Sequence, residues 1–365
     1  MDTHTISVVM PNYNDAERIG IALRAICEQD YSPLEVIVVD DGSTDNSVEV
    51  VRSFAQRYSN IRLVRNKFNQ GTMHSANLGA SMAKGRYLYF ASSNDMVLQG
   101  FFKKSVALLN QYPEGGLCWS DIKEVRANGS VHEHLYRWLP SAGYISPQDL
   151  ADITHTGHPL CLGGTAAILR RDLFNQNAYI SELGPFGDWF SSLVTVFRHG
   201  CCYIPEVLTV INSGGDRYSA NFRCDSKLYK RACVKLFQLL ASPEYEDVVP
   251  FFIRSGSLYS IENRGKSPLL ILNAFYSIKE LNRHSCKLLY HATAGYFLTL
   301  KPVGQTLSVL RATSEIIGRI LQLLKEISVT IFCSAKNLCD RFYAWSMHHY
   351  VKTRTVLRKK LGMAK

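Results

Sequence analysis

The sequence predicts an α/β fold, in which a mostly parallel sheet is flanked by helices and followed by a mainly helical region. Over residues 5–100, short apolar runs alternate with segments of helical period. One run, Val36–Val39, is apolar at every position, which is typical of a strand buried on both faces of a parallel sheet. Beyond residue 225 helical patterns replace the strand-like runs. We therefore expect residues 1–222 to form one domain and residues 223–365 to form a helical, basic and amphipathic region.

The first hundred residues contain four predicted strands with helices between them. The strands are Ile6–Met10, Val36–Val39, Ile61–Val64 and Tyr87–Ala91, and the helices are Asp15–Gln29, Ser47–Arg57 and Gly71–Lys84. Pro11 is expected to end the first strand, because proline has no N–H to donate within a sheet. Strands that alternate with helices build βαβ units, and ligands bind beyond the carboxyl ends of such strands. The polar segments Asn12–Asn14, Asp40-Asp41 and Ser92–Asp95 occupy those positions.

Residues 101–222 are less regular. The predicted elements are a helix at Phe101–Tyr112, strands at Gly115–Ser120 and Ala166–Leu169, a turn and helix at Gly184–Arg198, and an extended segment at Tyr203–Ile211 that breaks at Pro205. Farther along, apolar residues between Leu310 and Ile331 recur at helical spacing. This amphipathic stripe supports a helical C-terminal region.

The net charge of +10 is concentrated near the end of the chain. Residues 301–365 carry twelve Lys and Arg against Glu315, Glu326 and Asp340, a balance of +9. Basic residues mixed with apolar ones at Lys352–Lys360 suit either an anionic membrane surface or a solvated helical face. Residues 1–100 hold nine basic and eleven acidic groups, so we expect no nucleic-acid partner.

The sequence shows no signal for export or for crossing a membrane. The N-terminus lacks the basic and apolar regions of a signal peptide. No apolar stretch reaches the roughly 20 residues of a spanning helix, and the nearest candidate is Leu288–Leu300. The ten cysteines lack metal-ligand spacing, and we interpret them as reduced thiols that mostly fill the core. We expect a cytoplasmic protein, with peripheral attachment to the cytoplasmic face of a membrane as a further expectation.

Two adjacent carboxylates, Asp40 and Asp41, end a predicted buried strand and open the sequence DDGSTD. A carboxylate at a strand end can accept hydrogen bonds from a base or a ribose. The same residues also suit a tight turn followed by a helix cap, because Gly42 permits the turn and Ser43 to Asp45 are capping residues. By themselves these residues leave both interpretations open.

The order of motifs along the chain resembles that of the family 2 inverting glycosyltransferases, which have the GT-A fold. The resemblance rests on Ser7–Asn14, the DDGS segment, Asn69–Gly71 with Ala76–Gly79, Lys84–Phe90, Gly163–Ala166 with Arg170-Arg171, and Ile204–Leu208. It covers about residues 5–215. It implies that Pro11, Tyr13 and Asp41 line the nucleobase pocket, and that Asp40 supports the turn or the ribose.

The resemblance also implies a divalent metal, Mn²⁺ or Mg²⁺, which would stabilise the leaving diphosphate as a Lewis acid. Where a typical member reads DSDD, this chain reads Ser92-Ser93-Asn94-Asp95. Three outcomes are open: a metal held by Asn94 and Asp95, a weak metal or a basic side chain in its place, or an impaired enzyme. A zinc site at His155 and His158 is not expected, because no third ligand is evident.

An inverting transfer needs a general base, which the family places at the start of a helix beyond the acceptor segment. Asp188 lies at that position, while the Glu that usually precedes it is replaced by Gly187. We predict Asp188 as the base, although a helix-start Asp that stabilises the helix dipole is the alternative. Gly164 and Trp189 are predicted on the acceptor side, and Trp189 suits either sugar contact or the core.

The prediction is therefore a glycosyltransferase that moves a sugar from a nucleotide-sugar, expected to be a UDP-sugar, to a glycan or lipid-linked acceptor in cell-envelope polysaccharide synthesis. The alternative is a catalytically impaired protein of the same fold that binds nucleotide-sugars or acts as a scaffold. The oligomeric state is not predicted.

Overall fold

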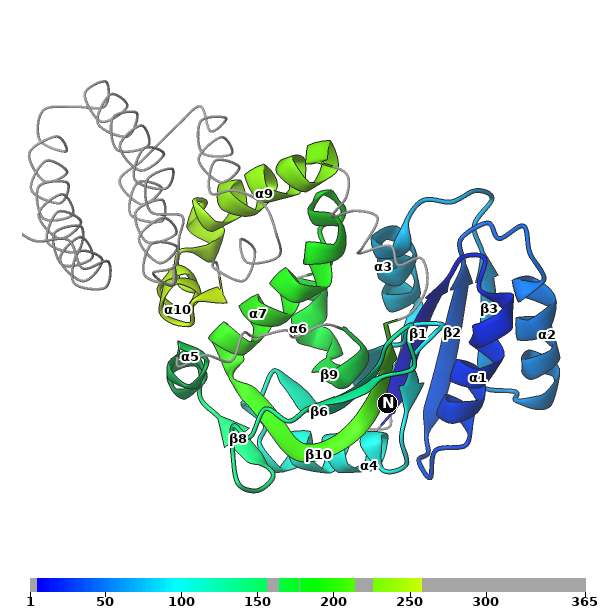
Figure 1. Ribbon diagram of the computed structural model, residues 1–365, viewed down its shortest axis with the longest axis horizontal. Coiled ribbons are helices and arrows are strands. Elements are labelled where there is room, and N and C mark those ends of the chain that lie inside the picture. The colour runs from blue at the N-terminus through cyan, green and yellow to red at the C-terminus, as the bar shows by residue number, and fades with distance from the viewer. Residues whose placement is uncertain (1–4, 156–163, 177, 214–225, 258–365) are drawn as a thin grey trace, which may run out of the picture. The chain divides into compact units, whose positions relative to one another are not determined.

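The computed structural model divides the chain into two compact units, residues 1–265 and 266–365. The structure describes residues 5–155, 164–176, 178–213 and 226–257, all in the first unit (Figure 1). The basic tail, the stripe from Leu310 to Ile331, the segment Leu288–Leu300 and His158 lie outside the described residues.

One sheet of ten strands organises the unit, in the order β3-β2-β1-β4-β9-β6-β10-β5, with β7 paired to β6 and β8 to β10. The strands are β1 Ile6–Asn12, β2 Leu34–Asp40, β3 Ile61–Arg65, β4 Tyr87–Phe90, β5 Met96–Val97, β6 Leu117–Val125, β7 Val131–His134, β8 Gly143–Ile145, β9 Ala167–Arg170 and β10 Cys201–Asn212. The first four strands are mutually parallel, as are β6 and β10. The antiparallel β9 joins β4 to β6. The predicted α/β fold is confirmed.

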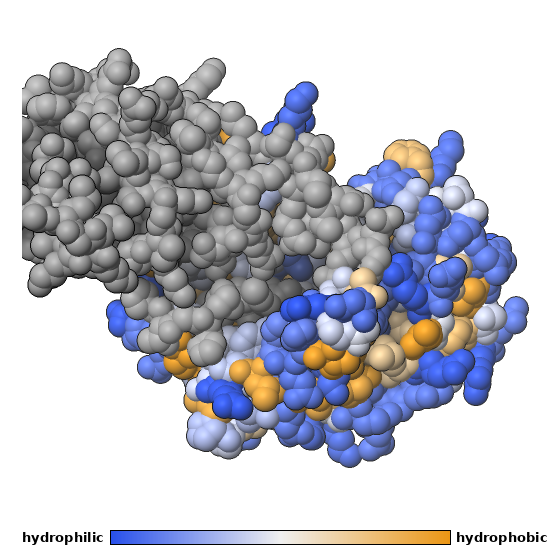
Figure 2. Space-filling model, in the orientation of Figure 1, coloured by the Kyte–Doolittle hydropathy of each residue, from blue (hydrophilic) through white to orange (hydrophobic). Residues whose placement is uncertain are grey.

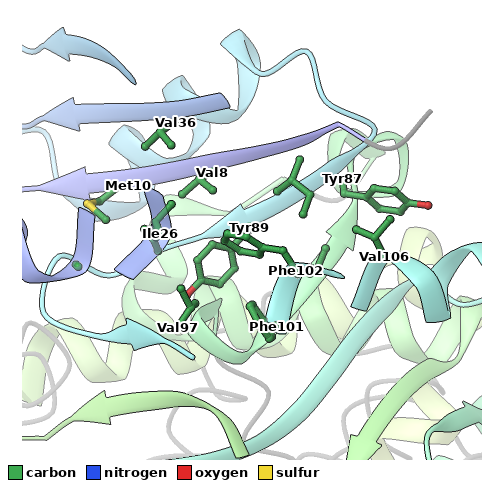
Figure 3. Close-up of a cluster of buried hydrophobic side chains, with 14 of the residues drawn as sticks. Val8, Met10, Ile26, Val36, Tyr87, Tyr89, Val97, Phe101, Phe102 and Val106 are labelled. Carbon is green, nitrogen blue, oxygen red and sulfur yellow. The ribbon is translucent and has the colours of Figure 1, made fainter. Parts of the chain in front are cut away.

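Helices cover both faces of the sheet (Figure 1). They are α1 Ala16–Cys27, α2 Ser47–Arg57, α3 Thr72–Met82, α4 Phe101–Gln111, α5 Pro147–His155, α6 Arg171–Gln176, α7 Gly187–His199, α9 Ser226–Leu240 and α10 Val249–Arg254, with short 3₁₀ turns η1 Gly164–Ala166, η2 Ser181–Phe186 and η3 Pro243–Tyr245. The core under α1, α2 and α4 takes every second residue of β1, namely Ile6, Val8 and Met10 (Figure 3).

The opposite face of the sheet packs against α3, which leads out of the loop after β3. Gly79 of α3 lies so close to the sheet that an added Cβ would stand 2.4 Å from Val9 Cγ1 and 3.2 Å from Val39 Cγ2. Only a residue without a side chain allows this approach. The position of α3, and of the loop before it, therefore depends on Gly79.

The first strand continues through Pro11 to Asn12, so the prediction that Pro11 ends it is wrong. The Val9 carbonyl accepts from Ala91 N on the β4 side at 2.9 Å, and the Asn12 carbonyl accepts from Asp41 N on the β2 side at 2.7 Å. Residues two apart face the same neighbour, so Pro11 faces β4, where the pairing has already ended at Val9. Pro11 has no N–H with which to extend the pairing with β4, while the pairing of β1 with β2 continues to Asn12.

β10 continues through Pro205, so the break predicted there takes the form of a shift in the register of its pairing with β6, between Ile204 and Val207. Several short elements were not predicted, among them β5, β7, β8, α5 and α6. All four residues of β7 are exposed, so no alternation of apolar and polar residues marks that strand.

Helices beyond residue 222 pack against α7 within the first unit. The Phe190 ring stacks on Phe252 at 5.8 Å between ring centroids, and Phe186 meets Tyr229 edge-on at 5.5 Å. Arg198 and Asp247 form an ion pair at 2.8 Å. The domain boundary at residue 222 stays a prediction. In the described fold, helices that follow this residue pack against elements that precede it.

None of the described helices is both long and apolar enough to cross a bilayer. The five cysteines within the described residues, Cys27, Cys118, Cys201, Cys202 and Cys233, are free, and four of them are buried. This agrees with the interpretation of cysteines as reduced core residues.

The contact at Gly79 gives a test of this packing. Gly79→Ala is expected to lower the free energy of unfolding by about 1–3 kcal/mol, because its methyl group overlaps the stiff Val9 side chain. Gly20→Ala in α1 is the matched control, since its nearest neighbour atom lies at 3.5 Å. The control should be neutral or stabilising by up to about 1 kcal/mol. Denaturant unfolding measures both, and equal effects would contradict the argument.

Candidate active site

The carboxyl ends of β1, β2 and β4 lie at one edge of the sheet. β1 pairs with β2 on one side and with β4 on the other, and all three run parallel. Asp41 directly follows β2, and Ser92 follows β4 after one residue. With neighbouring strands about 4.8 Å apart, these segments begin roughly 10 Å from each other. This is the point where the strand order reverses, which is where open α/β sheets bind ligands.

Asp40 is fully buried and supports the turn after β2. Its Oδ1 accepts from Asn12 Nδ2 at 3.1 Å, and its Oδ2 accepts from the Ser43 backbone N–H at 3.1 Å. Arg65 Nε lies 3.4 Å from Oδ2. Of the two roles predicted for Asp40, these contacts correspond to the support of the turn.

Asp41 orders the loop between β3 and α3. Its side chain is buried, and Oδ1 accepts from Asn66 Nδ2 at 2.8 Å and from Gln70 N at 3.0 Å. Oδ2 accepts from Gly71 N at 2.8 Å. Three of roughly four lone-pair positions of the carboxylate are thus in use. The predicted contact of Asp41 with a nucleobase stays a prediction, and one acceptor position remains for it.

Two exposed aromatic rings flank the Asp41-Gly42 turn. Tyr13, on the loop after β1, is 48% exposed, and Phe68, on the loop after β3, is 64% exposed. The backbone of Phe68 lies against Gly42, within 2.9 Å of the position that a Cβ there would take. Pro11 is half-buried at the end of β1. Aromatic faces in this position suit stacking against a planar base.

Phe68 was not predicted. A large apolar residue inside the polar segment Asn66–Gln70 was the available signal. Exposed large apolar side chains are few among the described residues, and the described surface in Figure 2 is mostly hydrophilic with separate apolar groups. Exposure of this ring in a polar loop is therefore notable, because a buried position would otherwise be expected for it.

The loop Ser92–Asp95 is held on two sides. Asp95 is buried, and its Oδ2 accepts from Thr165 Oγ1 at 2.9 Å while its Oδ1 accepts from Asn212 N at 2.9 Å. Asn94 Nδ2 donates to the Asn212 carbonyl at 3.3 Å. The hydroxyls of Ser92 and Thr165 lie 3.1 Å apart. The predicted metal loop is thus tied to η1 and to the end of β10.

These contacts do not fit a preformed site for Mn²⁺ or Mg²⁺. Such cations bind carboxylate oxygens with free lone pairs, often one or two carboxylates together with substrate phosphates. Here Asp95 is the one carboxylate of the loop, and each of its oxygens already accepts one hydrogen bond from the protein, so two of its roughly four lone-pair positions are in use. Within the described ranges, no three His, Cys, Asp or Glu side chains gather into a potential metal site. The residues predicted as metal ligands, Asn94 and Asp95, therefore serve another contact in this arrangement.

Asp188 lies in the first turn of α7 and faces η1. Its Oδ2 accepts from the Gly164 N–H at 3.3 Å, and its Oδ1 accepts from Trp189 N at 2.7 Å. The side chain is half-buried. Burial, and then the charge of Asp188, raise the pKa of the nearby Tyr179 well above its usual value. A helix N-terminus favours the ionised form of a carboxylate, which is the form a general base needs.

Thr165 links these groups and was not predicted. Its hydroxyl contacts Asp95 and Ser92, and it directly follows Gly164, which contacts Asp188. The structure thus brings together the loop after β4, the residue Gly164 and the predicted base.

Trp189 has neighbours in the helical layer. Its ring meets Phe186 edge-on at 6.4 Å and Phe252 at 6.1 Å between centroids, and its side chain is half-buried. These contacts agree with the core alternative for Trp189, and its predicted role on the acceptor side stays untested. His155 is the last residue of α5.

The fold is the GT-A fold. The crystal structure of residues 1–349 of TarS from S. aureus in complex with UDP-GlcNAc matches it with a TM-score of 0.58, over 80% of this chain and 87% of that one. Sequence identity is 17%, so this likeness concerns the fold.

A family model described as "Glycosyl transferase family 2" matches residues 7–177. An uncharacterized glycosyltransferase of Haemophilus influenzae is 29% identical over 84% of this chain and 95% of its own length. Residues 7–177 therefore carry a family 2 glycosyltransferase domain. The Escherichia coli protein WfgD, named UDP-Glc:alpha-D-GlcNAc-diphosphoundecaprenol beta-1,3-glucosyltransferase, is 28% identical over 30% of this chain and 42% of its own length. The chain covers 27%, 33% and 44% of three other bacterial relatives that it matches.

The role of Asp41 can be tested by Asp41→Asn. The amide nitrogen would face one of the loop N–H donors, so we expect the free energy of unfolding to fall by about 1–3 kcal/mol and the Gln70 and Gly71 amides to exchange hydrogen faster. Glu49→Gln is the control, since it changes an exposed ion pair with Arg52 and should shift stability by less than about 0.5 kcal/mol. Unchanged exchange at both amides would refute this role of Asp41.

Proposed function

We propose that this protein transfers a sugar, with inversion, from a nucleotide-sugar to a hydroxyl group of an acceptor. The observation that carries the proposal is the placement of Asp188. It lies at the N-terminus of α7 and is hydrogen-bonded to Gly164, one residue from the contact between Thr165 and the loop after β4. Tyr13 and Asp41 follow β1 and β2 at the same edge of the sheet as the loop after β4, which supports a base pocket on the side of the proposed general base.

In the proposed reaction, Asp188 accepts the proton of the acceptor hydroxyl. The acceptor oxygen then bonds to the anomeric carbon from the side opposite the leaving group. The bond between that carbon and the diphosphate oxygen breaks, and its electron pair leaves with the nucleoside diphosphate. One carbon–oxygen bond forms, one breaks, and the proton rests on the Asp188 carboxyl. The half-buried position of Asp188 limits competing water.

A UDP-sugar is the proposed donor, and a glycan or lipid-linked sugar in cell-envelope polysaccharide synthesis is the proposed acceptor. The names of two relatives support this assignment. WfgD is named for UDP-Glc and a diphosphoundecaprenol-linked sugar, and GgaB of Bacillus subtilis, 30% identical over 49% of this chain, is named for minor teichoic acid biosynthesis. We propose a cytoplasmic location, with the basic segment Lys352–Lys360 contacting an anionic membrane surface.

A second candidate function is nucleotide-sugar binding without transfer. The observation that favours it is the pair Ser92 and Asn94, which stand where the family carries carboxylates. In that case the base pocket would bind UDP normally while no sugar would be transferred.

Sugar transfer can be distinguished from nucleotide-sugar binding without transfer by measuring the release of UDP from a panel of UDP-sugars, with candidate acceptors present. For the enzyme, Asp188→Asn is expected to lower kcat by about 10²–10⁴-fold while UDP affinity changes less than about two-fold, because only the proton acceptor is lost. Ser181→Ala, at the exposed start of η2, is a matched control expected to keep full activity. Tight UDP binding with no turnover of any donor would favour the second candidate.

The base pocket has a separate test. Tyr13→Ala is expected to weaken UDP binding by about 1–3 kcal/mol, because loss of one stacking face removes that much from a base contact. Calorimetric titration with UDP measures the change. Ile21→Ala serves as control, as an equally exposed apolar residue on α1 that should leave binding unchanged. Equal affinities for all three proteins would place the base elsewhere.

A further inference from the structure

We propose that the loop Ser92–Asp95 is a tertiary clasp that positions Asp188, and that it does not bind a divalent cation by itself. The inference concerns the site of the proposed function and deepens it. Its first readouts, cation binding and unfolding, need no turnover, so it can fail while the transferase proposal stands, and the reverse.

The clasp is centred on Asp95. Its two carboxylate oxygens reach two different elements, with Thr165 Oγ1 of η1 at 2.9 Å and the Asn212 backbone N–H at the end of β10 at 2.9 Å. The side chain is 7% exposed. A buried carboxylate is stable when such donors compensate for its lost hydration. Each oxygen therefore has a structural task already.

A pair of asparagines closes the same junction. Asn94 Nδ2 donates to the Asn212 carbonyl at 3.3 Å, and Asn212 Nδ2 donates to the Asn94 carbonyl at 2.5 Å. Together with the bond from Asn212 N to Asp95, three hydrogen bonds join two residues of the loop to one residue of β10. In this arrangement the amide of Asn94 serves as a donor, which is a task that a carboxylate cannot perform.

The clasp reaches the predicted base through two neighbouring residues. Thr165 holds Asp95 and lies 3.1 Å from the Ser92 hydroxyl. Gly164, the preceding residue, donates its N–H to Asp188 Oδ2 at 3.3 Å. A shift of η1 would therefore move the donor that orients Asp188. Asp95 and Thr165 are positioning residues in this scheme.

Cation binding would compete with these contacts. A Mn²⁺ ion in the loop would meet one carboxylate, and direct ligation by Asp95 would weaken a bond to Thr165 or to Asn212. Ser92 and Asn94 carry no charge that would compensate for the weakened hydrogen bond. Mg²⁺ in such sites is usually held by one or two carboxylates together with substrate phosphates, so a single carboxylate without a nucleotide offers too little.

Titration of the full-length protein with Mn²⁺, without nucleotide and followed by electron paramagnetic resonance, tests the cation part. We expect no saturable binding below about 1 mM in the wild type. The double variant Ser92→Asp, Asn94→Asp supplies two carboxylates and is expected to bind Mn²⁺ at least about ten-fold more tightly. Saturable sub-millimolar binding by the wild type that Asp95→Asn abolishes would overturn the proposal.

Substitution at Thr165 tests the positioning part. Thr165→Val removes the hydroxyl without changing the side-chain volume much, and it should lower both the unfolding midpoint and kcat, with KM for the donor nearly unchanged. Thr165→Ser keeps the hydroxyl and should restore both, and added Mn²⁺ should not rescue Thr165→Val. A wild-type midpoint in Thr165→Val would refute the clasp. A lowered midpoint with an unchanged kcat, in a protein that turns over donor, would refute the positioning of Asp188.

Discussion

Parallel pairing of β1 with β2 on one side and β4 on the other is the constraint on which the rest of this site depends. Because the three strands run in the same direction, the segments that follow them emerge at one edge of the sheet. The turn at Asp41 and the loop Ser92–Asp95 are more than 50 residues apart in the chain, yet they flank the end of a single strand. The close contact of Gly79 with Val9 holds α3 and the loop before it at that edge.

Buried carboxylates organise this edge by holding loops. Asp40 supports the turn after β2, Asp41 orders the loop before α3, and Asp95 ties the loop after β4 to η1 and β10. In each case backbone, hydroxyl or side-chain amide donors satisfy a carboxylate that is less than a tenth exposed. A family motif can therefore be retained for loop geometry as well as for ligand contact. The neutral residues Ser92 and Asn94 fit a role in loop geometry, since both make contacts within the protein.

Much of the fold was predictable because β1, β2 and β4 are largely buried on both faces and the helices α1 and α2 carry a clear apolar stripe. The helix Ser47–Arg57 was predicted to the residue, and β2 contains the whole predicted run Val36–Val39. The sequence did not predict strands whose residues show no alternation of buried and exposed positions, as in the exposed strand β7. Prediction also failed at Pro11, where the consequence of a missing N–H depends on which neighbouring strand the residue faces. For the site, Asp188 was predicted from the family resemblance and its place at the start of a helix, whereas Thr165 and Asn212 carried no sequence signal for their contacts with Asp95.

By itself, the sequence determined the alternation of strands and helices, the resemblance to family 2 glycosyltransferases, and the residue types available at the strand ends. These follow from local periodicity and from the order of motifs, which need no knowledge of distant contacts. Only the tertiary structure decided what those residues do in the folded protein. Whether Asp95 is open to a cation or committed to Thr165 and Asn212 depends on which backbone and hydroxyl donors the sheet brings to it. Those donors lie 70 and 117 residues farther along the chain. Hydrogen bonding acts over about 3 Å in space, so no local pattern in the chain can encode it.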